Sequence, residues 1–137
     1  MALTGLDHCA IRTGDLAATR DFFVDVLGLE DGERPPFPFP GHWLYCGGRP
    51  VVHLIGLDAE GTRGLVDYMG EDRKQALTGS GAVDHVAFTA GDLDGMRETL
   101  KKLGVQSRER EVPDLHLHQI FVVDPNGITV EINFPTK

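Results

Sequence analysis

The stretch GLDHCAIRTGDL at residues 5–16 decides the fold, because AVDHVAFTAGDL at residues 82–93 repeats it. Asp-His, Ala and Gly-Asp-Leu recur in the same order, and six of the ten positions from Asp-His onward are identical. The second histidine, His85, lies 77 residues after His8. A period of this length is too long for a solenoid and indicates an internal duplication in which each copy carries one histidine.

The composition is that of an ordinary globular protein. The 137 residues suit one compact domain, with 41% hydrophobic and 25% charged residues. The net charge of −8 and the lack of a Lys/Arg cluster argue against a nucleic-acid partner. No apolar run approaches the ~20 residues of a membrane span, and no signal-peptide pattern begins the chain. Cys9 and Cys46 form no disulfide framework, so a reduced, cytoplasmic setting is expected.

Each copy is followed by a helical pattern with matching ends. Asp15 and Asp92 are expected N-caps, and Gly28 and Gly104 are expected to end the two helices after about three turns. Strand-like segments follow each helix, so each half reads βαβββ. The segments are residues 42–46 and 51–55 in the first half and residues 118–123 and 128–134 in the second.

These patterns predict an α+β fold in a single domain that covers residues 1–137. The first module is expected at about residues 1–56 and the second at about residues 83–137. A polar, Gly-rich connection at about residues 57–82 joins them.

The duplication also aligns four candidate metal ligands. His53 lies 45 residues after His8, and Glu131 lies 46 residues after His85, so each half offers two ligands at equivalent positions. Strand periodicity puts Glu131 on the polar face of an otherwise apolar strand, where an unpaired carboxylate is costly and a metal would compensate it. A single strand histidine is more often an ordinary hydrogen-bonded residue. The symmetric set of four favours a metal site.

The motifs together resemble the vicinal oxygen chelate superfamily, which includes glyoxalase I, methylmalonyl-CoA epimerase, fosfomycin-resistance proteins, extradiol dioxygenases and bleomycin-binding proteins. The resemblance rests on LDHCAI, FF.DVLGL, VHLI, VDHVAF, LKKLGV, DPNG and VEINF, and it covers nearly the whole chain. It implies two βαβββ modules whose mixed sheet curls around a metal-containing cavity, with the helices outside. It also implies one divalent metal ion (Fe, Zn, Ni, Co or Mn) held by His8, His53, His85 and Glu131.

The resemblance implies an enzyme that chelates a small substrate through two adjacent oxygens, and the role of His53 separates the alternatives. With four protein ligands the metal acts as a Lewis acid, as in a glyoxalase-type lyase or isomerase, which is the preferred interpretation. With His53 released, His8, His85 and Glu131 form the facial triad of an Fe(II)-dependent extradiol dioxygenase. A small-molecule binding or resistance protein with a vestigial metal is the third alternative.

The remaining site residues come from the same pattern. Glu131, His53 and His118 are the candidate catalytic residues. Epimerase-like members of the superfamily carry a glutamate base on the strand that here reads GHWLYCGG, and His42 or His118 could replace that missing base. The loop RPPFPFPGHW offers Phe39 and Trp43 as substrate-binding aromatic residues. The expected partners are the small-molecule substrate and a second copy of the chain, because small members of the superfamily usually form homodimers.

Overall fold

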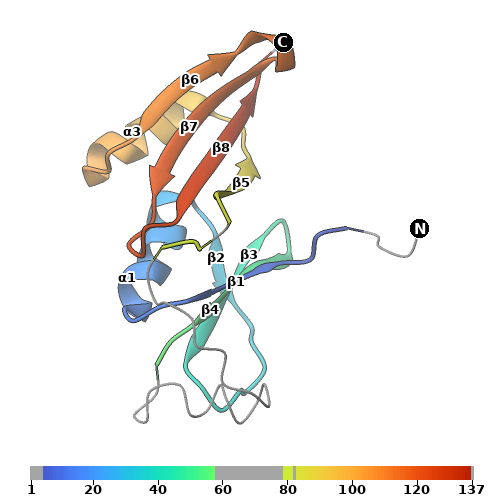
Figure 1. The fold of residues 1–137 in the computed structure, drawn as a ribbon, viewed down its shortest axis with the longest axis vertical. Helices are drawn as coiled ribbons and strands as arrows, with labels where there is room; N and C mark the ends of the chain where they lie inside the picture. The colour runs from blue at the N-terminus through green and yellow to red at the C-terminus, as the bar shows by residue number, and fades with distance from the viewer. Residues whose placement is uncertain (1–4, 58–78, 82, 137) are drawn as a thin grey trace. The chain divides into compact units, whose positions relative to one another are not determined.

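The computed structural model describes residues 5–57, 79–81 and 83–136. The chain divides into two compact units, Met1–Leu77 and Thr78–Lys137, and each contains one four-stranded mixed sheet (Figure 1). The predicted α+β fold of two βαβββ modules is therefore confirmed. The expected connection at residues 57–82 lies almost wholly outside the described residues.

The first unit contains one parallel and two antiparallel strand pairs. Its sheet has the order β1-β4-β3-β2, with β1 parallel to β4 and the other neighbours antiparallel. Helix α1 packs against β3 and β4. The elements are β1 (Cys9–Arg12), α1 (Leu16–Asp21), a π-helical segment (Phe22–Val26), β2 (Glu30–Gly32), β3 (Gly41–Cys46) and β4 (Arg49–Ile55).

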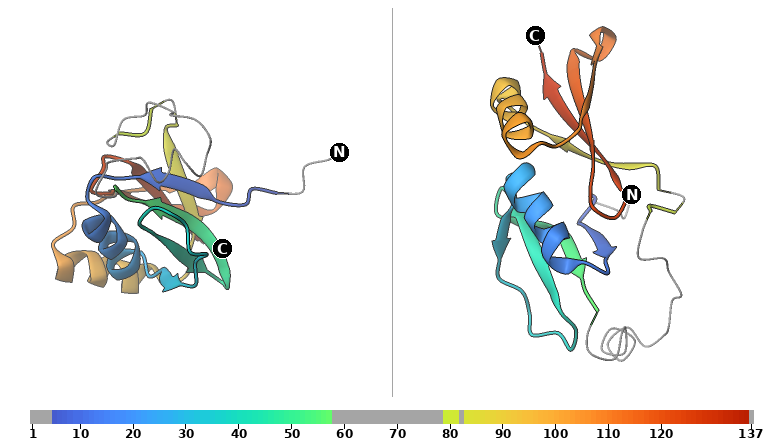
Figure 2. Two further views of the ribbon diagram at one scale, coloured as in Figure 1. Left: turned by 90° about the horizontal axis from the view of Figure 1, so that it is seen from below. Right: turned by 90° about the vertical axis from the view of Figure 1, so that its left-hand side faces the viewer.

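The second unit repeats this topology. Its sheet has the order β5-β8-β7-β6, again with the first pair parallel and the others antiparallel. Figure 2 shows each helix on one side of its own sheet. The elements are β5 (His85–Thr89), α3 (Leu93–Leu103), β6 (Arg108–Val112), a 3₁₀ turn (Pro113–Leu115), β7 (Leu117–Val123) and β8 (Thr129–Pro135).

The helix ends follow the capping residues of the sequence. The side chains of Asp15 and Asp92 accept hydrogen bonds from backbone N–H groups three residues later, both at 3.0 Å. Gly104 ends α3 with φ of 67°, a left-handed conformation that glycine adopts at little cost. The first helix differs from the expectation, because Phe22–Val26 winds as a π-helix before Gly28.

Alternation along the strands gives each sheet one apolar face and one open face. In β8 the side chains of Val130, Ile132 and Phe134 are buried at 0, 2 and 3% exposure. Because successive strand residues point to opposite faces, Glu131 lies on the other face. The same alternation puts His53 opposite buried Val52 and Leu54 in β4. No helix in the described ranges is long and apolar enough to cross a membrane.

Candidate metal and substrate site

The first unit brings His8 and His53 into contact. His8 directly precedes β1, and His53 is paired with Ala10 where β4 runs beside β1. The two imidazole rings are stacked, with centroids 3.7 Å apart and planes 13° from parallel. Two of the four expected ligands are therefore neighbours within this unit.

His8 is held by the aspartate that precedes it. Its Nδ1 lies 2.6 Å from Oδ2 of Asp7. This hydrogen bond lowers the pKa of Asp7, so the carboxylate is ionised and can only accept. Nδ1 therefore carries the hydrogen, and Nε2 of His8 keeps a lone pair that a metal can bind.

His53 has the opposite arrangement. Its Nε2 lies 3.0 Å from the carbonyl oxygen of Pro50, which can only accept, so Nε2 carries the hydrogen and Nδ1 keeps the lone pair. Burial, and secondarily the nearby His8, lowers the pKa of His53, which favours the neutral ring. Imidazole lone pairs lie in the ring plane, so the parallel rings of His8 and His53 do not aim at one common point.

The second unit pairs the other two expected ligands. Nε2 of His85 lies 3.6 Å from Oε1 of Glu131. Nδ1 of His85 lies 2.9 Å from Oδ2 of Asp84, and this hydrogen bond is the main reason that the pKa of His85 is raised. The Asp-His dipeptide of each repeat thus makes the same contact. In both units it leaves Nε2 of the histidine directed away from the aspartate.

Glu131 is oriented by two amides that the sequence reasoning missed. Its Oε2 accepts a hydrogen bond from Nδ2 of Asn133 at 2.9 Å. Oδ1 of Asn133 in turn accepts one from Nε2 of Gln119, also at 2.9 Å. Asn133 could have been predicted from the sequence, because it lies two residues from Glu131 on the same strand face. Gln119 is the cross-strand partner of Asn133, and this register is not visible in the sequence.

The donor set fits a divalent transition metal. Three imidazoles and one carboxylate are ligands that Zn²⁺, Mn²⁺ and Fe²⁺ accept. The donors occur as two pairs, one in each unit. Within the described ranges of the chain, no three His, Cys, Asp or Glu side chains gather into a metal-binding group.

The expected substrate-binding aromatic residues belong to a series of contacting rings that begins at His53. The ring of Trp43 stacks on the other side of His53, with centroids 4.2 Å apart and planes 12° from parallel. Phe37 lies 6.1 Å from Trp43, and Phe39 is stacked 5.3 Å beyond Phe37. The guanidinium of Arg34 lies 5.1 Å above both phenylalanine rings. Trp43 thus contacts a candidate catalytic residue directly, whereas Phe39 is two rings away.

His118 lies on the opposite face of its sheet from Glu131. It is paired with Phe134, and its ring is buried with Nε2 at 2.7 Å from Oε1 of Glu109. Nη2 of Arg97 donates to the same carboxylate oxygen at 2.8 Å. This placement under helix α3 does not support the catalytic role expected for His118.

The first unit contains the same network under its own helix. Nε of Arg20 donates to Oδ2 of Asp31 at 2.7 Å, and Nδ1 of His42 lies 2.9 Å from that oxygen. Arg20, Asp31 and His42 are the same kinds of residue, on the corresponding elements, as Arg97, Glu109 and His118. The strand registers do not make the two histidines equivalent, because His42 is paired with Leu54 and His118 with Phe134. The network joins helix to sheet in each unit, so a structural role accounts for both histidines.

A family model for the Glyoxalase/Bleomycin resistance protein/Dioxygenase superfamily matches residues 5–132. The chain belongs to this superfamily. The match confirms the resemblance inferred from the sequence, and it covers both Asp-His repeats together with Glu131.

Among curated proteins, the chain is 24% identical over 135 residues to a 2,2',3-trihydroxybiphenyl dioxygenase of Sphingomonas paucimobilis. The match covers 95% of this chain but only 41% of that dioxygenase. The activity of the longer relative therefore does not transfer with the match.

Solved structures of the superfamily share the fold. A putative glyoxalase family protein from Bacillus anthracis is 18% identical with a TM-score of 0.70, over 99% of this chain and 98% of that one. A lactoylglutathione lyase from Agrobacterium tumefaciens is 19% identical with a TM-score of 0.63, over 98% and 96%. A mutant of the fosfomycin resistance protein FosX from Listeria monocytogenes, complexed with Mn(II) and 1S,2S-dihydroxypropylphosphonic acid, is 18% identical with a TM-score of 0.68, over 98% and 94%. At these identities the likeness establishes the fold alone.

Proposed function

We propose that the chain is a metal-dependent enzyme that binds a small substrate through two adjacent oxygens. In this proposal His8, His85 and Glu131 hold one divalent ion, and His53 acts beside it as an acid/base. Such an ion supplies Lewis-acid stabilisation of negative charge on the substrate oxygens, and Fe²⁺ also supports chemistry with O₂.

The observation that carries the proposal is the repeated Asp-His contact. Asp7 and Asp84 hold Nδ1 of His8 and His85, so both histidines present Nε2 as the metal-binding atom. A carboxylate on the far nitrogen is the usual support for a metal-binding histidine, since it fixes the tautomer and the ring orientation. The duplication provides this support twice.

The state of His53 favours three protein ligands over four. With its Nε2 donating to Pro50 and its ring stacked on His8, His53 offers Nδ1 as a proton acceptor rather than as a ligand for the ion of His8. Three protein ligands leave room for a bidentate catecholate and O₂, which is the requirement of extradiol ring cleavage. His53 would then accept a proton from a substrate hydroxyl at Nδ1. We therefore favour a ring-cleaving dioxygenase.

A Lewis-acid lyase or isomerase is the second candidate. The observation in its favour is that His53 and Glu131 occupy equivalent positions, since both are paired with an alanine of the neighbouring parallel strand. A rotation of the His53 ring away from Pro50 would supply a fourth ligand. The reaction would then use the two remaining positions of the ion for the substrate.

Metal exchange separates the two reactions. The purified protein is analysed for bound metal, stripped, and reloaded with Fe²⁺, Mn²⁺ or Zn²⁺ under argon. We expect the Fe²⁺ form alone to consume O₂ in a one-to-one ratio with a catechol. Retention of metal without O₂ uptake from any of several catechols would favour the Lewis-acid reaction, and failure to retain any metal would contradict the proposal.

We also propose that the protein acts as a homodimer. Sedimentation at micromolar concentration tests this assembly, and a stable monomer would contradict it.

A further inference from the structure

Strand β6 separates its charges by face. Arg108 and Arg110 alternate with Glu109 and Glu111, so the two arginines share one face and the two glutamates share the other. Glu109 and Glu111 lie on the face of His118, and Glu109 is bonded to Arg97 and His118. The glutamate face thus belongs to the helix-anchoring network.

The arginines lie on the face of Glu131. Arg108 is paired with Phe121 of β7, and Phe121 is paired with Glu131 of β8. One row across the sheet therefore reads Glu131, Phe121, Arg108. Two strand spacings put the backbone of Arg108 about 10 Å from that of Glu131.

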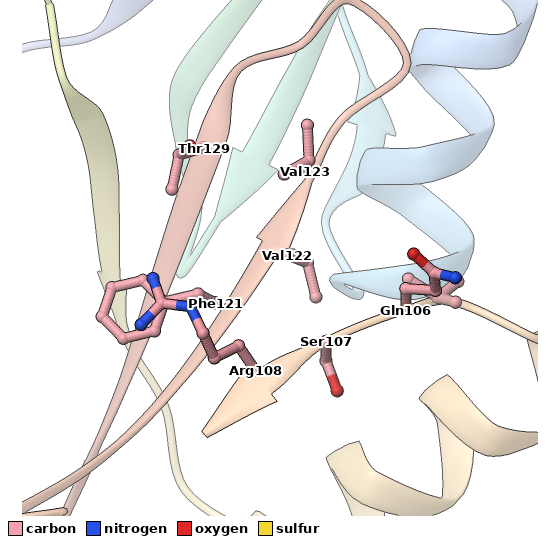
Figure 3. Close-up of a pocket in the computed structure, with 8 residues that line it drawn as sticks. Gln106, Ser107, Arg108, Phe121, Val122, Val123 and Thr129 are labelled. Atoms are coloured by element: carbon pink, nitrogen blue, oxygen red, sulfur yellow. The ribbon is translucent and has the colours of Figure 1, made fainter. Parts of the chain in front are cut away.

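A pocket opens at the Arg108 end of this row and does not include Glu131 or Arg110 in its lining. It has a volume of about 400 Å³, and its lining includes Arg108, Phe121 and Thr129 (Figure 3). Figure 3 shows the guanidinium of Arg108 lying across the ring of Phe121, and the distance from its carbon to the ring centroid is 4.4 Å. The stacked guanidinium keeps its N–H donors available for a ligand.

Among the described residues, neither arginine is paired with a carboxylate. Charged residues on an edge strand also prevent pairing with other sheets, and β6 is an edge strand. Protection of the edge explains why β6 is charged. It does not explain why both charges on the face of Glu131 are positive in a protein whose net charge is −8. A guanidinium stacked on an aromatic ring, with a second arginine on the same strand face, is suited to an anion attached to an apolar or aromatic group.

We propose that Arg108 and Arg110 bind a carboxylate of the substrate, while Phe121 contacts the ring between that carboxylate and the chelating oxygens. The inference rests on the proposed function, because it names the residues that bind one end of a substrate whose other end is held by the metal. The substrate class is accordingly an aromatic acid with two adjacent oxygens. The first unit has a glycine at this position: Gly32 is paired with Trp43 as Arg108 is paired with Phe121, and a Cβ on Gly32 would lie 2.6 Å from the ring of Tyr45.

The test compares the catechol acid dihydrocaffeate with its methyl ester, which has the same two hydroxyls and no charge. Binding to the Mn²⁺-loaded protein is measured by calorimetry under argon. We expect the acid to bind about tenfold more tightly than the ester, as charge-assisted hydrogen bonds to two guanidinium groups imply.

Variants assign the preference to the arginines. Arg108→Gln and Arg110→Gln should each reduce the preference for the acid over the ester, and the double substitution should abolish it. Arg108→Lys should keep part of it, because a lysine keeps the charge but not the planar donor pair. Lys102→Gln, which makes the same change in net charge on the exposed side of α3, should keep all of it.

The outcomes distinguish this inference from the proposed function. A protein that binds Mn²⁺ and the ester but shows no preference for the acid overturns the carboxylate site alone. A preference for the acid that persists in the doubly substituted protein also overturns the carboxylate site alone. A protein that does not bind Mn²⁺ overturns both.

Discussion

In the first unit the open face of the sheet carries His53 beside Trp43, whereas in the second unit the same positions carry Glu131 beside Phe121. His53 is stacked between two rings and bonded to a backbone carbonyl. Glu131 is bonded to Asn133 and lies next to His85. The neutral position is thus surrounded by rings, and the anionic position by polar donors.

The helix-covered faces have not diverged in this way. Each keeps an arginine of the helix, a carboxylate of the edge strand and a histidine of the next strand, with Asp31 in one unit and Glu109 in the other. This network attaches a helix to its sheet, and that structural role is the same in both units. The proposed function accounts for the difference between the open faces, since a single ion that needs one anionic ligand would leave the equivalent position for another role.

The largest expected effect comes from the anionic position. Glu131→Gln removes the one negative ligand of the proposed site while keeping the shape of the side chain. Metal affinity should therefore fall by more than about 100-fold, the upper end for residues that only support a ligand. Titration with Mn²⁺ monitored by electron paramagnetic resonance measures this. Glu98→Gln on the exposed side of α3 is the control for charge. Equal Mn²⁺ affinity in the Glu131→Gln variant and the parent would mean that the metal binds elsewhere.

The equivalent substitution in the first unit should have a different effect. His53→Ala should keep the metal and reduce turnover of a catechol by about 100-fold or more, the usual contribution of a general base. The comparison requires metal content and kcat to be measured on the same preparation. His116→Asn, on an exposed left-handed turn, is the control. Loss of metal together with turnover would show that His53 is a fourth ligand.

Some elements of the fold could be predicted from the sequence and others could not. The repeated Asp-His and Gly-Asp-Leu predicted the two modules and the helix ends, because capping and duplication are local signals. The edge strand β6 was not located, since its sequence REREV has no apolar face, and β2 is too short to show a period.

The site was predicted in the same uneven way. Glu131 could be placed on the open face from the alternation of Val130 and Ile132 around it. His118 could not be placed, because its face depends on its pairing with Phe134, which is a matter of register. The contact of Asp84 with His85 was likewise not predictable, although the dipeptide itself recurs in both repeats.

A smaller effect is expected from the Asp-His contact, which is the same in both units. Asp84→Asn and Asp7→Asn should each weaken metal binding by about tenfold, the lower end for residues that orient a ligand. Nitrogen-15 spectra of the metal-free protein should show His85 protonated at Nδ1 in the parent and a mixture of tautomers in the Asp84→Asn variant. Asp114→Asn controls for charge. An unchanged tautomer and unchanged affinity would remove Asp84 from the site without affecting the assignment of His85.

The smallest effect should come from the helix-anchoring network. Glu109→Gln removes the ion pair with Arg97 and weakens the hydrogen bond with His118, so the free energy of unfolding should fall by about 1 kcal/mol at pH 7. The hydrogen bond from Arg97, followed by that from His118, lowers the pKa of Glu109 below its ordinary 4.5. A carboxylate with a lowered folded-state pKa stabilises the protein above its ordinary pKa, and this contribution is lost as the pH falls through the folded value. Urea unfolding of parent and variant should therefore differ at pH 7 and converge as the pH is lowered below 4.5. A difference that stays constant over this range would mean that the loss comes from packing rather than from charge.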